Sequence, residues 1–214
     1  FTSFGNWVDP SYYDMDAFPY FANGWIIGDF KTVSSGNDYW APLPDPFDSK
    51  FSERALITVQ QVANEVKNSP WCVGVFIDNE KSWGQMGQAA TQYGVVIGAL
   101  KLNANESPAK LHFTALLKAK YGEISQLNSA WQTDITSWEV FEAGVQLALF
   151  NEALEEDLSI LLYEFAHKYF SVVDDAMKKE MPNHLYMGAR FADWGMTPEL
   201  RAAAADVVDV VSYN

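Results

Sequence analysis

The sequence predicts an α/β protein built on a parallel sheet. Apolar, β-branched runs alternate along the chain with segments whose apolar residues recur at helical spacing, which is the pattern of consecutive β–α units. The clearest strand is Cys72–Ile77, a continuously apolar run of the kind that is buried on both faces of a parallel sheet. No Gly-x-Gly-x-x-Gly follows a strand and no phosphate-loop motif is present, so a nucleotide-binding sheet is disfavoured.

The remaining elements follow from the same patterns. We expect strands over residues 1–8, 20–27, 72–77, 184–191 and 207–212. The first helix is expected to be capped by Ser52 and stopped by Pro70, after a long loop from Asp29 to Lys50 of a length that usually carries function. Further helices are expected over 108–120 and 123–131, from Ser137 to about Glu180, and from Thr197 onward, with residues 81–106 as a loop with short helices.

Charge and composition narrow the class of partner. A formal net charge of −14 repels phosphate backbones, so nucleic acid is disfavoured and we expect no nucleic-acid partner. No apolar stretch reaches the ~20 residues of a membrane span. Aromatic residues make up 15% of the chain, and many of its eight Trp stand in loop-like sequence, where flat apolar faces suit sugar rings. Core packing is the alternative for each Trp.

Cysteine and histidine usage predicts neither a disulfide nor a metal site. Cys72 is the single cysteine and begins an apolar strand, so we expect a small buried hydrophobic side chain rather than a catalytic thiol. His112, His167 and His184 lack metal-ligand spacing. We therefore expect no metal and no cofactor.

Polar or aromatic residues follow each expected strand. In sequence order they are Asn6 and Trp7, Asp29, Asp78 to Glu80, Arg190, and Tyr213 with Asn214. In a (β/α)₈ barrel the catalytic groups lie at the carboxyl ends of the strands, so these side chains would converge on one face.

Glu80 is the candidate catalytic acid. Hydrolysis of a glycosidic bond needs two carboxyl groups, one of which protonates the leaving oxygen. Glu80 follows six apolar residues and stands beside Asn79, which is suited to bind the sugar hydroxyl next to the anomeric carbon. The alternative is a structural Glu paired with Lys81 or with an arginine.

Other candidate substrate-binding residues rest on position alone. Arg190 would hold Glu80 or a sugar hydroxyl, or would form a structural salt bridge. Trp83 and Trp194 are candidate sugar platforms, with loop packing as the alternative. We expect Asn6 and Trp7 to line the subsites on the non-reducing side of the scissile bond. Tyr213 would orient the second catalytic carboxylate.

The motifs around these residues resemble known sugar hydrolases. The run Gly74 to Glu80 resembles the fourth strand of the retaining barrel superfamily that contains the β-galactosidases, in which an Asn-Glu pair ends the strand and the Glu is the acid/base. A closer resemblance, over essentially the whole chain, is to the β-agarases of glycoside hydrolase family 50. It is carried by Phe4-Gly5-Asn6-Trp7, Phe21-Ala22-Asn23-Gly24-Trp25, Phe76 to Gly84, Gly188-Ala189-Arg190-Phe191-Ala192 and Val211-Ser212-Tyr213-Asn214.

The resemblance implies an incomplete (β/α)₈ TIM barrel, with residues 1–214 supplying about strands two to six of a single catalytic barrel and both termini cut inside that domain. It implies a retaining hydrolase of the β-1,4-galactosidic bonds of agarose or neoagaro-oligosaccharides. The family's nucleophile is a Glu on the seventh strand, which no residue of this chain supplies. The polymeric substrate implies a secreted or periplasmic bacterial protein.

Two alternatives stay open at this point. One is a β-galactosidase-like hydrolase of the same superfamily, and the other is a truncated, non-catalytic carbohydrate-binding barrel. The sequence does not decide between exo and endo attack, and it does not give the oligomeric state.

Overall fold

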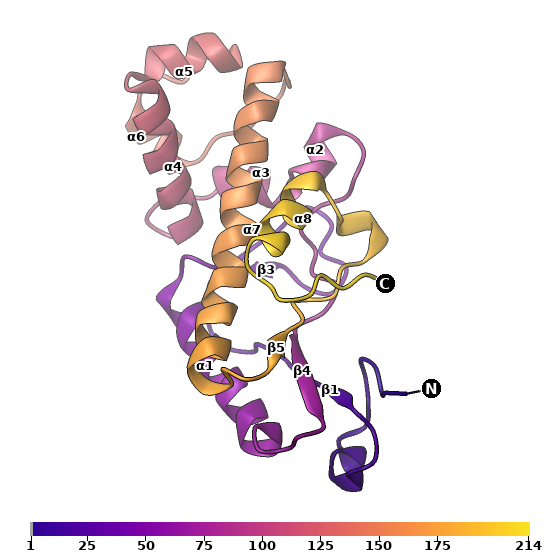
Figure 1. The fold of residues 1–214 in the computed structure, drawn as a ribbon. Coiled ribbons are helices and arrows are strands. Elements are labelled where there is room, and N and C mark those ends of the chain that lie inside the picture. Colours follow the sequence, from indigo (N-terminus) through magenta and orange to yellow (C-terminus); the bar gives the residue numbers. More distant parts are fainter. Residues whose placement is uncertain (1) are drawn as a thin grey trace.

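The protein is an α/β structure around a small parallel sheet. The computed structural model describes residues 2–214, so Phe1 of the expected first strand lies outside the described residues. The sheet has the order β1 (Tyr20–Gly24), β4 (Cys72–Ile77), β5 (Leu185–Tyr186), and both pairings are parallel. The three strands lie side by side in the same order as they occur along the chain, and helices lie in the connections between them (Figure 1). The predicted α/β class with a parallel sheet is confirmed.

The connections hold most of the helical residues. A short antiparallel pair, β2 (Thr32–Val33) with β3 (Leu43–Pro44), lies between β1 and the first α-helix. The helices are η1 (Pro10–Met15), α1 (Ser49–Val66), α2 (Ala89–Gln92), α3 (Gly94–Lys101), α4 (Pro108–Tyr121), α5 (Ile124–Trp131), α6 (Trp138–Ala143), α7 (Glu152–Glu180), η2 (Asp193–Gly195) and α8 (Pro198–Ala205).

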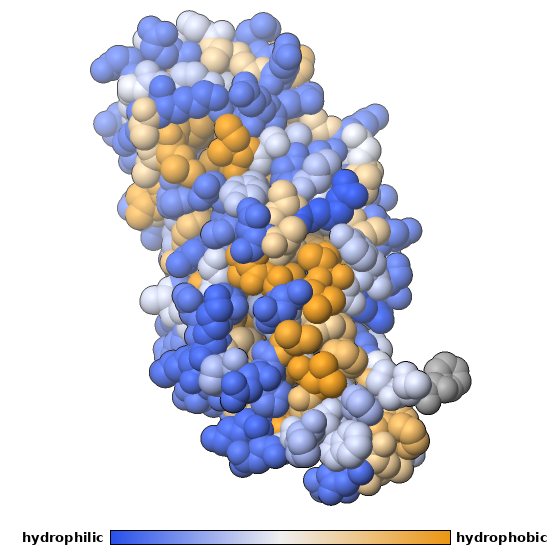
Figure 2. Space-filling model, viewed as in Figure 1, coloured by the Kyte–Doolittle hydropathy of each residue, from blue (hydrophilic) through white to orange (hydrophobic). Residues whose placement is uncertain are grey.

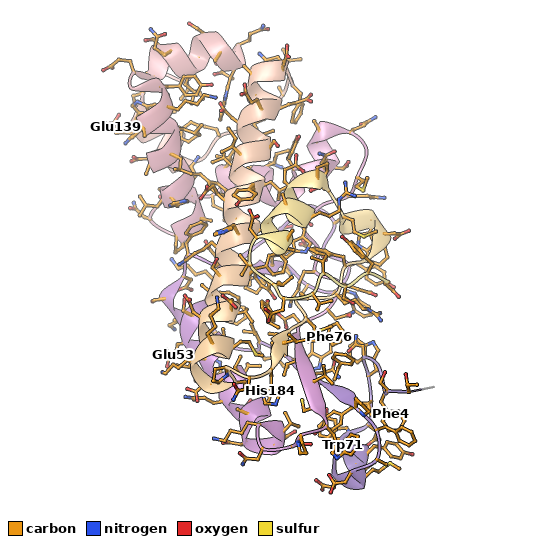
Figure 3. The ribbon with its side chains drawn as sticks, in the orientation of Figure 1. Phe4, Glu53, Trp71, Phe76, Glu139 and His184 are labelled. Carbon is orange, nitrogen blue, oxygen red and sulfur yellow. The ribbon has the colours of Figure 1, made fainter. Side chains whose placement is uncertain are left out.

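Strand β4 is the centre of the sheet. Five of its six residues are buried, as its unbroken apolar sequence predicts for a strand with neighbours on both sides. Gly74 allows the close approach of β5, because a Cβ there would lie 2.6 Å from the carbonyl oxygen of Leu185. Figure 3 labels Trp71 before the strand and Phe76 near its carboxyl end, which is the end that carries the polar residues.

Helices α1 and α7 pack side by side against the sheet (Figure 1). The fully buried rings of Phe51 on α1 and Tyr169 on α7 stack with centroids 5.3 Å apart. Helix α7 runs for 29 residues because its buried residues recur at helical spacing along one face, from Leu154 to Met177. Helix α7 also packs against α8, so this one helix contacts both α1, early in the chain, and α8, near its end.

Two helix boundaries differ from the sequence prediction. The first helix begins four residues early, because Asp48 rather than Ser52 is its N-cap and accepts a hydrogen bond from the Lys50 N–H at 3.1 Å. The expected continuous helix from Ser137 is divided into α6 and α7. Gly144 ends α6 with a φ of 118°, and Asn151 opens a new helix by capping the Leu154 N–H.

The outer strands are shorter than predicted. No strand forms within residues 2–8, where Phe4 donates one backbone hydrogen bond to Pro19. The expected strand over 184–191 is reduced to β5 and a bridge at Arg190. The expected strand over 207–212 is wrong. The N–H groups of Val207 and Val208 bond back to the Ala204 carbonyl at the end of α8, and extended pairing begins only at Tyr213.

One face of the sheet region is apolar at its surface. Figure 2 shows apolar side chains gathered over β4, β5 and the segment after α8. Val73, Leu185 and Val210 are each more than a third exposed there. No helix within residues 2–214 is long and apolar enough to cross a membrane.

Candidate active site

The carboxyl end of β4 turns sharply at two residues. Asp78 has a φ of 63° and Glu80 a φ of 48°, both in the left-handed region that residues with a Cβ seldom occupy. Such conformations cost about 1–3 kcal/mol each and cluster at functional sites. A backbone bond from the Glu80 N–H to the Arg190 carbonyl, 2.9 Å long, holds the turn against the segment after β5.

Asp78 is a buried brace beneath this turn. Its Oδ1 accepts the Ile26 N–H at 3.0 Å, and its Oδ2 accepts the Tyr169 hydroxyl at 2.6 Å. Lys81 lies 3.1 Å from the same Oδ2. Complete burial, together with the Asp78 charge, raises the pKa of Tyr169 well above its ordinary value. The hydroxyl therefore stays protonated and donates a hydrogen bond to Asp78. Asp78 thus ties the ends of β1 and β4 to α7.

Glu80 is held by two donors on one oxygen. Its Oε1 accepts Nη2 of Arg190 at 3.1 Å and Nδ2 of Asn214 at 2.6 Å. The side chain of Glu80 is 9% exposed. Guanidinium and amide nitrogens only donate here, so a proton on this carboxyl group belongs on Oε2. The geometry leaves one oxygen for proton transfer and fixes the other.

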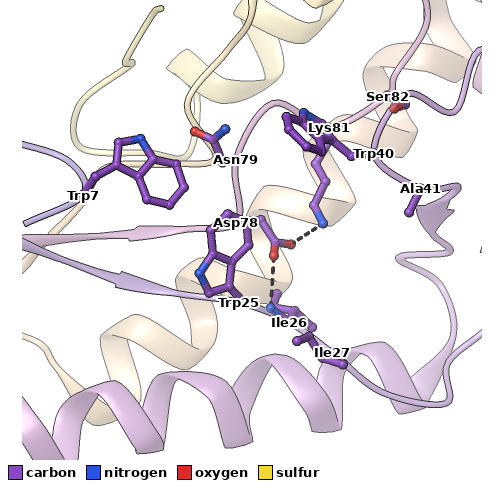
Figure 4. A pocket seen from close by; sticks show the side chains of 10 residues that line it. All are labelled: Trp7, Trp25, Ile26, Ile27, Trp40, Ala41, Asp78, Asn79, Lys81 and Ser82. Atoms are coloured by element: carbon purple, nitrogen blue, oxygen red, sulfur yellow. Dashed lines mark hydrogen bonds and ion pairs between the residues drawn. The ribbon is translucent and has the colours of Figure 1, made fainter. Parts of the chain in front are cut away.

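A cavity of about 380 Å³ opens beside this strand end (Figure 4). Its walls include three exposed indoles and three polar residues of the β4 turn, which are Trp7, Trp25, Trp40, Asp78, Asn79 and Lys81. Glu80 does not line this cavity, because its carboxylate faces Arg190 and Asn214.

The indole pair at one wall is supported from behind. The rings of Trp7 and Trp25 stack with centroids 5.4 Å apart, and Figure 4 shows them on the same side of the cavity. Two side chains of α1 hold the segment after β1. Thr58 donates to the Trp25 carbonyl at 3.1 Å, and Arg54 donates to the Ile27 carbonyl at 2.7 Å. The wall is therefore a fixed aromatic surface.

Asn79 is the polar group best placed for a ligand. It lines the cavity between Trp7 and Lys81 (Figure 4), and its buried Oδ1 has no hydrogen-bond partner within residues 2–214. Buried polar atoms are rarely left unpaired, so this oxygen marks a position where a ligand hydroxyl would fit. The Nε of Arg190 is a second unpaired buried atom at this end of the sheet.

The structure brings some predicted site residues together and separates others. Glu80 and Arg190 are in contact, while Asn79 and Trp7 share the cavity. Asn6 accepts the N–H of Trp7 and does not line the cavity. The other two predicted residues are separate as well. Tyr213 is half exposed beside Phe191, and Trp194 borders a different cavity.

The expected role of Trp83 as a sugar platform is wrong. Its side chain is 1% exposed and packs against Phe165, Tyr169 and Phe170. The large apolar face of an indole stabilises the core when an apolar pocket is available, and α7 supplies that pocket. Trp83 belongs to the core that supports the site.

Five residues of the site were not predicted as site residues, and they are Trp25, Trp40, Asp78, Lys81 and Asn214. Asp78 and Asn214 were named at strand ends without a role of their own. Trp25 follows the observed end of β1 at Gly24, but the expected strand ran to residue 27, so the strand-exit rule pointed past it to Asp29. Trp40 belongs to the long loop that was expected to be functional. Lys81 was treated only as a partner of Glu80, whereas it pairs with Asp78.

Cys72 is a buried side chain, as predicted. Burial raises the pKa of its thiol to about 11. Within residues 2–214, no group of three or more His, Cys, Asp or Glu side chains is arranged to hold a metal ion.

The fold and the site define an α/β protein of the class that collects its functional groups at the carboxyl ends of parallel strands. The particular class follows from comparison with known proteins. No family model matches the chain. The whole chain aligns at 46% identity with β-agarase B and at 42% with β-agarase A of Vibrio sp. (strain JT0107). It spans about a quarter of these relatives, 23% and 22% of their lengths.

Solved structures agree with these relatives. The agarase AgWH50C superposes on the whole chain with a TM-score of 0.96 at 56% identity, and the chain covers 30% of that structure. An exo-β-agarase gives a TM-score of 0.97 at 53% identity, again with 30% coverage. A β-galactosidase of Halorubrum lacusprofundi shares the fold over 92% of this chain, with a TM-score of 0.61 at 16% identity and coverage of 30% of that structure. The resemblance to the family 50 β-agarases is confirmed along the whole chain.

Proposed function

We propose that this chain is part of the catalytic (β/α)₈ barrel of a retaining β-agarase and that Glu80 is the acid/base. Glu80, held on one oxygen by Arg190 and Asn214 at the carboxyl end of β4, is the observation that carries the proposal. The whole-length likeness to proteins named β-agarases supports the substrate class. Agarose or neoagaro-oligosaccharides are then the substrates, and export to the periplasm or outside the cell follows from the size of the polymer.

The barrel is supported by the order of the strands. β1, β4 and β5 are parallel neighbours, and the bridge from Phe191 to Tyr213 adds the next parallel position on the same edge. Consecutive β–α units that add strands in one direction are the way in which a barrel closes. The apolar surface at Val73, Leu185 and Val210 suits burial by further parts of the same barrel.

In the first half of the reaction, Glu80 Oε2 gives its proton to the bridging oxygen as the glycosidic bond breaks. The anomeric carbon is taken by a second carboxylate, which the family resemblance assigns to a strand outside these 214 residues. In the second half, the ionised Glu80 removes a proton from water, which attacks the glycosyl-enzyme. Arg190 stabilises the ionised form of Glu80 in that half.

The other binding residues would act on the sugar itself. Asn79 would accept a hydrogen bond from the hydroxyl beside the anomeric carbon through its unpaired Oδ1. Trp7 would stack on a sugar ring together with Trp25. Asn6 would keep the backbone of Trp7 in place, and Tyr213 would orient the second carboxylate.

The proposal is tested with Glu80→Gln and Glu80→Ala in the full natural polypeptide. We expect a loss of about 10²- to 10⁴-fold in turnover of agarose with oligosaccharide binding retained, because a positioned acid/base contributes that much. Azide should restore activity of Glu80→Ala on an aryl galactoside by attacking the glycosyl-enzyme, which releases the enzyme carboxylate and yields a galactosyl azide of retained configuration. The control is Glu106→Gln, an exposed carboxylate on a loop.

The outcome separates the alternatives. Wild-type rates in Glu80→Gln remove Glu80 from the mechanism. Cleavage of nitrophenyl galactoside without cleavage of agarose would favour a β-galactosidase. Oligosaccharide binding without turnover in the unmodified protein would favour a non-catalytic binding barrel.

A further inference from the structure

A second cavity lies next to the first, beside Trp40. It measures about 300 Å³ and is lined by Asn37, Tyr39, Gln85 and Trp194, none of which borders the cavity beside β4. Tyr39 lines this cavity and its neighbour Trp40 lines the other, with their rings 4.9 Å apart and nearly perpendicular. The Tyr39–Trp40 pair is therefore a partition between the two cavities.

The lining of the second cavity is chemically suited to a neutral sugar. The rings of Tyr39 and Trp194 lie 6.0 Å apart, and the Tyr39 side chain is 69% exposed. Flat aromatic faces pack on the C–H face of a pyranose. The amides of Asn37 and Gln85 each donate and accept hydrogen bonds, as sugar hydroxyls do. Among residues 2–214, no charged side chain lines this cavity, so its described lining would not recognise a phosphate or a carboxylate.

The loop that carries Tyr39 is held in a defined shape. Asp38 accepts hydrogen bonds from the Ser34 hydroxyl at 2.6 Å and from the Ser35 N–H at 2.9 Å. The same serines lie against two glycines of α3. A Cβ at Gly94 would collide with the Ser35 carbonyl oxygen, and a Cβ at Gly98 would collide with that of Ser34.

The backbone of Trp194 is held as well. Its carbonyl accepts the Met86 N–H at 2.9 Å, and its own N–H is capped by Asp193 at 2.8 Å. Both aromatic walls are thus presented by ordered backbone before a ligand arrives, which lowers the cost of binding.

We propose that this second cavity is a remote subsite for one neutral sugar unit of the glycan chain that is cleaved at Glu80. The inference rests on the proposed function and deepens it, because it assigns to Tyr39 and Trp194 the recognition of substrate length. At about 300 Å³ the cavity is at the small end of ligand sites, which suits one sugar unit. A glycan long enough to pass the Tyr39–Trp40 partition would occupy both cavities, and a short one would occupy the first alone.

The test uses Tyr39→Ala and Trp194→Ala in the full natural polypeptide, with neoagaro-oligosaccharides of increasing length and an aryl galactoside as substrates. We expect KM for the longest substrate to rise about 3- to 10-fold, which is the worth of one lost aromatic contact, and kinetics on the aryl galactoside to stay within about twofold. Tyr12→Ala is the matched control, because Tyr12 is also an exposed tyrosine but lies in η1. Thermal melting of each variant checks that it is folded.

A binding measurement separates this inference from the proposed function. Titration of the same oligosaccharides into Glu80→Gln, with and without Tyr39→Ala, reports the subsite without any turnover. If Glu80→Gln leaves turnover intact but Tyr39→Ala still weakens binding of the long substrates alone, the proposed mechanism fails and the subsite stands. Equal effects at every length, or none at any length, would overturn the subsite.

Discussion

The stability of the protein should depend on pH through one buried lysine. Lys110 on α4 is fully buried, with its Nζ donating to the Leu100 carbonyl at 2.9 Å and lying 3.8 Å from the centre of the Phe141 ring. Burial lowers the pKa of this ammonium from 10.5 to about 7. Lys110→Met replaces it with an unbranched apolar chain, and the Leu100 carbonyl keeps its bond from the Val145 N–H.

The sign and size of this pH dependence of the free energy of unfolding follow from linkage between folding and proton binding. Above pH 7 the unfolded chain keeps the lysine proton and the folded protein releases it, so the free energy of unfolding rises with pH. With a pKa of about 7 folded and 10.5 unfolded, the rise from pH 7 to 8.5 is about 1.5 kcal/mol. Below pH 7 the buried Lys110 ammonium is charged, and its full destabilisation of the folded protein is on the order of 5 kcal/mol. This destabilisation disappears only above pH 10.5.

Urea unfolding between pH 7.0 and 8.5 measures this dependence. Cys72 is the reason for the upper limit, since its raised pKa makes stability fall once the unfolded thiol ionises. We expect Lys110→Met to be more stable than the wild type at pH 7 and to lose the slope. Lys118→Met, on the same helix but partly exposed and paired with Glu142, should keep the slope. A slope that survives in Lys110→Met would refute the reasoning.

Two further predictions concern the site. Tyr169→Phe removes the buried donor to Asp78 and should lower the free energy of unfolding by about 1.5–3 kcal/mol, the worth of a hydrogen bond to a charged group, as measured by urea unfolding; an unchanged midpoint would contradict the bracing role of Asp78. Asn214→Ala removes one donor from Glu80 and leaves Arg190 in place, so kcat should fall about 10- to 100-fold with KM unchanged. Steady-state kinetics on an oligosaccharide decide this, and a rise in KM alone would assign Asn214 to substrate binding instead.

The sequence was most informative where one physical signal dominated. The unbroken apolar run of β4 and the abrupt polar residues after it predicted both the central strand and the position of Glu80. Helix α4 follows its pattern because Ser107 caps it and Pro108 occupies its first turn. At these places local preference and tertiary packing favour the same conformation.

The sequence predictions that failed have a common physical cause. In each case a residue could adopt more than one conformation or contact, and residues distant in the sequence decided between them. Val207 and Val208 have strand-forming side chains, but their N–H groups donate hydrogen bonds to the Ala204 carbonyl at the end of α8 instead of to a neighbouring strand. Trp83 is as suitable for a sugar as for a core, and the aromatic face of α7 decided the outcome. Asn214 reaches Glu80 across 134 positions of the chain, a contact that no local pattern encodes.

The two left-handed residues at the end of β4 have a consequence for how this site can change. In a regular strand, side chains 78 and 80 would point to the same face and 79 to the other. With the backbone turned at both, three successive residues instead serve three different neighbours. Asp78 reaches α7, Asn79 enters the cavity, and Glu80 meets Arg190. A β-branched residue at 78 or 80 would straighten this turn, so engineering of any one of these contacts has to preserve the geometry of all three.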